Sequence, residues 1–135
     1  MRIYKITDKI EYKLGELSIK ISPLSVEDKN ILTGLMFKGQ AKQDIAALME
    51  GSLYALQCAI KEISGLENAD GSEYVLQFDD NGKLTKECAS ELLNIDQDSK
   101  LISLCSSFIN GVPSKLPEGI SLVETKKPKN MKAQK

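Results

Sequence analysis

The sequence predicts a single α+β domain followed by an extended arm, and three patterns lead to that fold class. Apolar and polar residues alternate on both sides of Gly15-Glu16, which is typical of a β-hairpin. Residues 41–63 carry apolar side chains at steps of three and four, which is typical of an amphipathic helix. From residue 112 onwards prolines and lysines dominate, so we assign residues 1–111 to the domain and 112–135 to the arm.

The N-terminal hairpin is expected to pair two short strands within EYKLGELSIKI, residues 11–21. In each strand every second side chain is apolar and can face a core. These inward-facing residues are Tyr12, Leu14, Leu17, Ile19 and Ile21. Residues 2–6, RIYKI, either add a short third strand or pair elsewhere.

Two helices are expected after the hairpin. Ser25 has the features of an N-cap, because acidic residues follow it in the first turn of the first helix. This helix runs to about Met36, and residues 37–40 form a break. A long central helix then spans residues 41–63, about 34 Å at 1.5 Å per residue. Its predicted core face consists of Ile45, Leu48, Met49, Leu53, Leu56, Ile60 and Ile63.

Residues 66–84 are expected to form a second short hairpin. Asp70-Gly71 and Asn81-Gly82 are strong turn pairs. Between them, apolar residues alternate with polar ones from Tyr74 to Phe78, as in a half-buried strand.

Two further helices complete the predicted domain. Thr85 is expected to cap a third helix that reaches about Asn94. Asp98 or Ser99 is expected to cap a fourth helix over residues 100–109. In the arm, residues 120–123 can form one edge strand or a docking segment.

The composition argues against an enzyme and against a membrane protein. Histidine is absent, which removes Ser–His and Cys–His nucleophile pairs and the commonest metal ligand. The cysteines Cys58, Cys88 and Cys105 lie among apolar neighbours, so we expect buried free thiols. No apolar run approaches the roughly 20 residues of a membrane-spanning helix.

No cofactor or metal site is expected either. FDDNGKLTKEC resembles a calcium loop, but alignment on Gly82 places Gln77 and Cys88 where the first and last ligands belong. Asp79 and Asp80 are adjacent acids in a turn, which are usually solvated rather than catalytic. The glycines lack the spacing of a phosphate-binding loop.

Charge is distributed unevenly along the chain. Residues 62–98 hold ten acidic and two basic side chains, whereas residues 126–135 hold five lysines and no acid. These two parts either attract each other or meet different partners. Nucleic acid is a poor candidate partner, because the lysine-rich end lacks arginine and stacking aromatics.

The order of elements over residues 59–111 resembles a known family. AIKEISGLENADGSEYVLQFDDNGKLTKECASELLNI and DSKLISLCSSFING give a helix end, an Asp-Gly hairpin, a capped helix with paired leucines and a last amphipathic helix. This order resembles the tail assembly chaperones of long-tailed bacteriophages. The resemblance implies a non-enzymatic protein of the host cytoplasm. Such a protein coats the tape measure protein, or another tail protein, until tube subunits polymerise around it.

A chaperone of this kind needs a weak, repeated surface for amphipathic helices. Met36, Phe37 and Met49 are candidates because methionine adapts to varied partners, although the helical pattern favours the core for Met49. Exposed acids can face basic partner segments, and the terminal lysines can dock on an acidic surface. The candidate partner-binding residues are Met36, Phe37, Asp79, Asp80, Glu87, Lys126, Lys127 and Lys129.

Two other functions remain open at the level of sequence. The chain can be a virion structural protein whose C-terminal arm contacts neighbouring subunits. It can also be a small inhibitor or adaptor that binds a host protein through its acidic face. Self-association is a further option for the partner.

Overall fold

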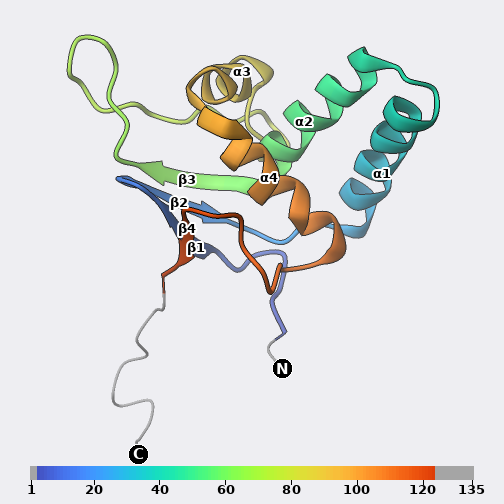
Figure 1. The fold of residues 1–135 in the computed structure, drawn as a ribbon. Helices are drawn as coiled ribbons and strands as arrows, with labels where there is room; N and C mark the ends of the chain where they lie inside the picture. The colour runs from blue at the N-terminus through green and yellow to red at the C-terminus, as the bar shows by residue number, and fades with distance from the viewer. Residues whose placement is uncertain (1–2, 124–135) are drawn as a thin grey trace, which may run out of the picture.

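The computed structural model describes residues 3–123 of the chain and has the expected α+β architecture. An antiparallel sheet has the strand order β3-β2-β1-β4, and the helices cover one of its faces (Figure 1). The elements in chain order are β1 Ile10–Leu14, β2 Leu17–Ile21, α1 Val26–Ala41, α2 Ile45–Ala59, β3 Ile60–Ser64, α3 Lys86–Ile95, the 3-10 turn η1 Gln97–Ser99, α4 Lys100–Ser107, the 3-10 turn η2 Phe108–Asn110, and β4 Ile120–Leu122.

The predicted N-terminal hairpin is confirmed. β1 and β2 pair antiparallel with Tyr12 opposite Ile19, and both side chains are buried. Gly15 adopts a φ of 61°, a left-handed conformation that glycine reaches without a steric penalty. The turn therefore fixes the register that points the apolar set toward the helices.

The opposite face of the sheet is charged. Lys20 lies in register between Glu11 of β1 and Glu62 of β3. Glu62 also accepts a hydrogen bond from Lys9 at 2.7 Å, and this bond lowers the pKa of its carboxyl. Charged cross-strand pairs suit a sheet face that carries no covering helix.

The long helix predicted over residues 41–63 is wrong at both ends. α2 begins at Ile45 and ends at Ala59, and the chain continues directly into β3. There Ile60 lies opposite Ile21, and Ile63 lies opposite Ile19. The step of three between these isoleucines fits a helical stripe, and it fits a strand only because the register shifts between their β2 partners.

The break between the first two helices also lies further along the chain than predicted. α1 continues through residues 37–40, and Asp44 caps α2 by accepting a backbone hydrogen bond at 3.2 Å. Gly39 is buried inside α1, where an added Cβ would lie 2.4 Å from Cδ2 of Leu48. Gly39 therefore permits close packing of the helix pair instead of forming the turn.

The predicted caps of the first and third helices are confirmed, whereas Ser99 occupies the N-cap position of the fourth helix without a side-chain capping hydrogen bond. Ser25 accepts a backbone hydrogen bond at 3.1 Å in α1, and Thr85 accepts one at 3.2 Å in α3. The fourth helix is capped by Asp96, whose carboxylate accepts two α4 backbone N–H groups at 2.7 and 3.1 Å. Asp98 and Ser99 both have positive φ values, and the turn they form brings Asp96 to this helix end.

The second predicted hairpin exists only as two turns. Gly71 and Gly82 each donate a backbone hydrogen bond to the carbonyl three residues earlier, at 2.9 and 3.1 Å. Residues 66–84 contain no strand, because pairing is limited to single bridges. The bridged pairs are Glu67–Glu73 and Phe78–Leu84.

The core lies between the sheet and the helices and is mainly aliphatic. Tyr12 of β1 and Phe108 of η2 meet edge to face, with ring centroids 6.1 Å apart and an interplanar angle of 89°. The largest fully buried aliphatic side chains are Ile19, Ile21, Leu32, Leu56, Ile60, Leu84, Leu92, Leu101 and Leu104.

Part of the predicted arm belongs to the sheet. β4 pairs with β1, with Ile120 buried opposite Leu14, which confirms the edge strand expected at residues 120–123. Residues 124–135 lie outside the described part of the chain. Residues 3–6 form no strand, which argues against the third-strand alternative for residues 2–6, and β3 and β4 complete the sheet.

Candidate functional site

An apolar surface lies open on the first two turns of α2. Ile45, Leu48 and Met49 expose 71%, 37% and 62% of their area, and we call these three residues the α2 surface. The sequence placed all three on the core face of the central helix. That prediction is wrong for the N-terminal half of α2 and correct for Leu56, which is fully buried.

Small residues explain why the α2 surface stays open. Ala47, Gly51 and Ala55 are buried on one edge of α2. A Cβ added to Gly51 would lie 3.6–3.8 Å from three α1 side chains, so α1 occupies this edge at close range. Leu48 packs against Gly39 of α1, whereas the Ile45 and Met49 side chains stay mostly exposed.

The covering helices are too short for α2. α2 has 15 residues, whereas α3 has 10 and α4 has 8. Figure 1 shows the start of α2 at the end of the α1–α2 hairpin that lies away from the sheet. The apolar stripe of α2 therefore runs beyond the helices that bury its second half.

The two candidate residues on α1 have different environments. Phe37 exposes 66% of its area and remains accessible. Met36 is half-buried and packs against the core. Phe37 is therefore a surface residue, whereas Met36 takes part in the contact between α1 and α2.

The candidate acids are all exposed, but one of them has a structural role. Asp79 accepts backbone hydrogen bonds from Asn81 at 2.8 Å and Lys83 at 3.0 Å, so its carboxylate holds the turn. Asp80 and Glu87 have exposed side chains. The candidate lysines Lys126, Lys127 and Lys129 lie outside the described residues.

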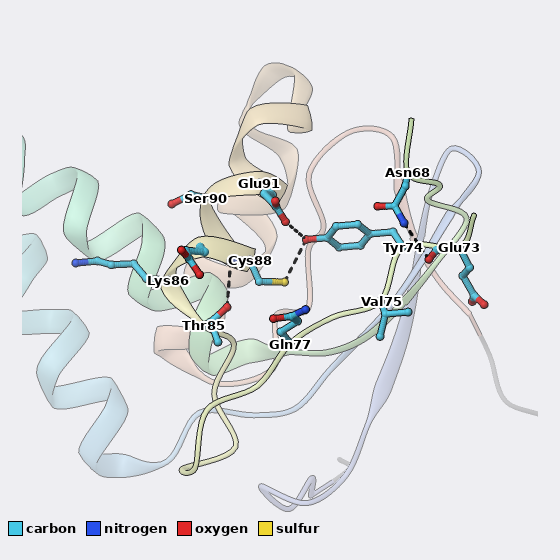
Figure 2. A pocket seen from close by; sticks show the side chains of 11 residues that line it. Asn68, Glu73, Tyr74, Val75, Gln77, Thr85, Lys86, Cys88, Ser90 and Glu91 are labelled. Carbon is cyan, nitrogen blue, oxygen red and sulfur yellow. Dashed lines mark hydrogen bonds between the residues drawn. The ribbon is translucent and has the colours of Figure 1, made fainter. Parts of the chain in front are cut away.

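A groove runs between the extended segment 73–77 and α3, and Figure 2 shows its lining. The Tyr74 side chain reaches across to α3, where its hydroxyl donates to Glu91 at 2.6 Å and lies 3.3 Å from the Cys88 sulfur. Burial raises the pKa of Tyr74, and the hydrogen bonds with Cys88 and Glu91 raise it further. Tyr74 therefore stays protonated and ties the extended segment to α3.

Sequence reasoning missed this groove. Its two walls are separated by the turn at residues 79–82, and neither wall carries a motif. The alternation from Tyr74 to Phe78 was the one available signal, because it places Val75 on the exposed side. The groove residues are Asn68, Glu73, Tyr74, Val75, Gln77, Thr85, Lys86, Glu87, Cys88, Ser90 and Glu91.

A second polar cluster joins α1, α2 and the turn at 79–82. Asp28 accepts a hydrogen bond from Tyr54 at 2.8 Å and lies 3.5 Å from the Lys83 ammonium. Burial alone would raise the pKa of Asp28, but the Tyr54 hydrogen bond and the Lys83 charge outweigh it and hold the pKa below its ordinary value. Every member is satisfied within the fold, so the cluster is structural.

The cysteines are buried free thiols, as predicted. Burial raises the pKa of Cys58 to about 11 and raises that of Cys105 further, which disfavours the reactive thiolate. Within residues 3–123, no group of three or more histidine, cysteine or acidic side chains is placed to hold a metal ion.

Comparison with other proteins adds no family to this picture. No helix within the described residues is long and apolar enough to cross a membrane. No family model matches the chain, and neither a curated protein nor a solved structure matches it significantly. Function has to be inferred from the α2 surface and the groove.

Proposed function

We propose that this protein is a non-enzymatic assembly factor that binds an amphipathic helix of another protein on the α2 surface. The partner proposed is the tape measure protein of a long-tailed bacteriophage, which makes the chain a tail assembly chaperone of the host cytoplasm. One observation carries the proposal: the apolar stripe of α2 extends past the helices that cover it, leaving Ile45 and Met49 exposed.

A helix is the element that best completes this stripe. The second half of α2 is already covered by helices, and a further helix can continue the same packing. Ile45 and Met49 lie four residues apart on one face, which is the spacing of anchors in helix-in-groove recognition. Methionine also accommodates partners of varied shape.

The expected strength of this contact suits a chaperone. Fully burying one large apolar side chain stabilises by roughly 1.5–3 kcal/mol, and association costs at least about 4 kcal/mol. Three side chains therefore give weak binding at each site. Many copies along one long helical partner would give strong overall binding that is lost when the partner is enclosed.

The first test measures binding of the full chain to a purified tape measure protein. The double variant Ile45→Gln/Met49→Gln should weaken binding by about tenfold or more, which corresponds to about 1.4 kcal/mol. Val75→Gln is the matched control, because Val75 is equally exposed but lies in the groove. Unchanged binding of the double variant would contradict the proposed surface.

A second test asks where the protein is found. Mass spectrometry should detect it in the infected-cell lysate and not in purified particles, because a chaperone leaves the finished structure. Stoichiometric presence in particles would sink the chaperone proposal and favour a virion structural protein.

A further inference from the structure

A second cleft lies away from the groove beside α3 and shares no lining residue with it. It opens between residues 4–12 and the loop 110–116, has a volume of about 850 Å³, and we call it the Tyr12 cleft. This volume lies in the range of clefts that hold small molecules. Most of the lining is hydrocarbon, including Ile6, Ile10, Leu24, Val112, Leu116 and Leu122. The cleft can therefore cover the apolar part of a ligand.

The Tyr12 cleft contains a polar group without a partner. Tyr12 is only 1% exposed, and its hydroxyl forms no hydrogen bond within residues 3–123. In the same residues, every solvent-sealed side-chain nitrogen or oxygen of a buried or half-buried residue has a hydrogen-bond partner. The small exposed area of Tyr12 therefore includes its hydroxyl, which reaches the cleft that Tyr12 lines. Burial raises the pKa of Tyr12 to about 12, with a smaller contribution from Tyr4, so the hydroxyl stays protonated and can donate.

Lys29 is the one charged residue among the described residues that line this cleft. It lies in the first turn of α1 and is half-buried. Its ammonium has no ion-pair or hydrogen-bond partner within residues 3–123. The neighbouring Asp28 is instead paired with Tyr54 and Lys83. A partly buried cation that lacks a counter-charge favours an anionic ligand.

We infer that the Tyr12 cleft binds a small amphiphile in which one carboxylate ends an unbranched alkyl chain, as in a fatty acid. The alkyl chain lies against the hydrocarbon lining, where each buried methylene favours binding. The carboxylate accepts a hydrogen bond from Tyr12 and pairs with Lys29, whose flexible side chain can follow the ligand. A peptide fits this cleft less well, because its amides would be buried against hydrocarbon without enough partners.

Isothermal titration calorimetry of the full chain with octanoate, decanoate and octanol tests the ligand class. Decanoate should bind about fivefold or more tightly than octanoate, because it buries two further methylenes. Octanol has the same alkyl chain as octanoate without the charge, and it should bind about tenfold more weakly. Equal binding of octanol and octanoate, no gain from octanoate to decanoate, or no detectable binding of decanoate would overturn the inference.

Two variants test the residues of the cleft. Lys29→Gln should weaken octanoate binding by about tenfold and leave octanol binding unchanged. Lys115→Gln is its matched control, because Lys115 is an exposed lysine of the loop 110–116 that does not line the cleft, and it should change neither. Tyr12→Phe retains the ring contact with Phe108. It should weaken octanoate binding by about threefold or more through the lost hydrogen bond. Octanoate binding that is unchanged in Lys29→Gln or in Tyr12→Phe would contradict the site.

The double variant Ile45→Gln/Met49→Gln separates the Tyr12 cleft from the α2 surface. Lys29 lies near the start of α1, whereas Ile45 and Met49 follow its end. This double variant should bind octanoate as tightly as the unmodified chain. Loss of octanoate binding in it would place the ligand on the α2 surface and sink the inference. None of these measurements involves a tape measure protein, so their failure is separate from failure of the proposed function.

Discussion

The two halves of α2 carry one apolar stripe but have opposite environments. In the second half, Leu56 is fully buried and Leu53 packs against the core. In the first half, Ile45 and Met49 are mostly exposed. The side chains are of the same kind, so the difference comes from how much of each half the rest of the fold covers.

This difference teaches that periodicity reveals an apolar face but not its occupant. A stripe buried within the domain stabilises the fold, whereas its exposed continuation is available to a partner. The same helix thus supplies both the core and the proposed binding surface. The following predictions test that division, from the largest expected effect to the smallest.

Shortening a large apolar side chain to alanine should change the free energy of unfolding by unequal amounts in the two halves of α2. Leu56→Ala should lower the free energy of unfolding by about 2–5 kcal/mol, because it leaves a cavity in the core. Met49→Ala should change it by less than about 0.5 kcal/mol. Denaturant unfolding measures both, and a similar loss in the two variants would mean that the first half is also covered.

The open half should nevertheless be tightly packed on its α1 side. Gly39→Ala should cost about 1–3 kcal/mol, because the new Cβ would lie 2.4 Å from the Leu48 side chain. Gly34→Ala is the matched control in α1, since no atom lies within 4 Å of its added Cβ. It should stabilise by about 0.4–1 kcal/mol through helix propensity. Thermal or denaturant unfolding that ranks the two variants the other way would contradict this packing.

The stability of the covered half of α2 should depend on pH through Asp28, because the Asp28 carboxylate accepts a hydrogen bond from Tyr54 of α2. Its pKa is lowered in the folded chain, so its contribution is present above the unfolded value of about 3.9 and is lost as pH falls through the folded pKa. Asp28→Asn should cost about 1 kcal/mol at pH 7. Unfolding measured between about pH 2 and pH 7 should show a shallower acid dependence in the variant than in the unmodified chain.

The smallest effect is expected from the binding variant. Ile45→Gln/Met49→Gln should leave the free energy of unfolding within about 0.5 kcal/mol of the unmodified chain, because both side chains are already solvated. Circular dichroism during denaturant unfolding measures this. A larger loss would mean that the double variant cannot separate binding from folding.

Local signals predicted much of the fold. The Gly15-Glu16 turn, the caps at Ser25 and Thr85, and the turns at Gly71 and Gly82 were all readable, because each depends on residues within a few positions. The partner-binding choice of Phe37 agreed with its exposure, whereas the interpretation of Met49 as core did not. The part of α2 that α3 and α4 cover, and the groove beside α3, could not be predicted from neighbouring residues in the sequence.

The sequence by itself determined the α+β class, the hairpin, the starts of α1, α3 and α4, and the apolar stripe of residues 45–63. Tertiary structure decided how that stripe is divided. Ile60–Ser64 became a strand because β2 offered an edge, whereas Ile45 and Met49 stayed mostly exposed. The physical reason is that backbone pairing and burial depend on which distant segments arrive alongside, and periodicity carries no information about that.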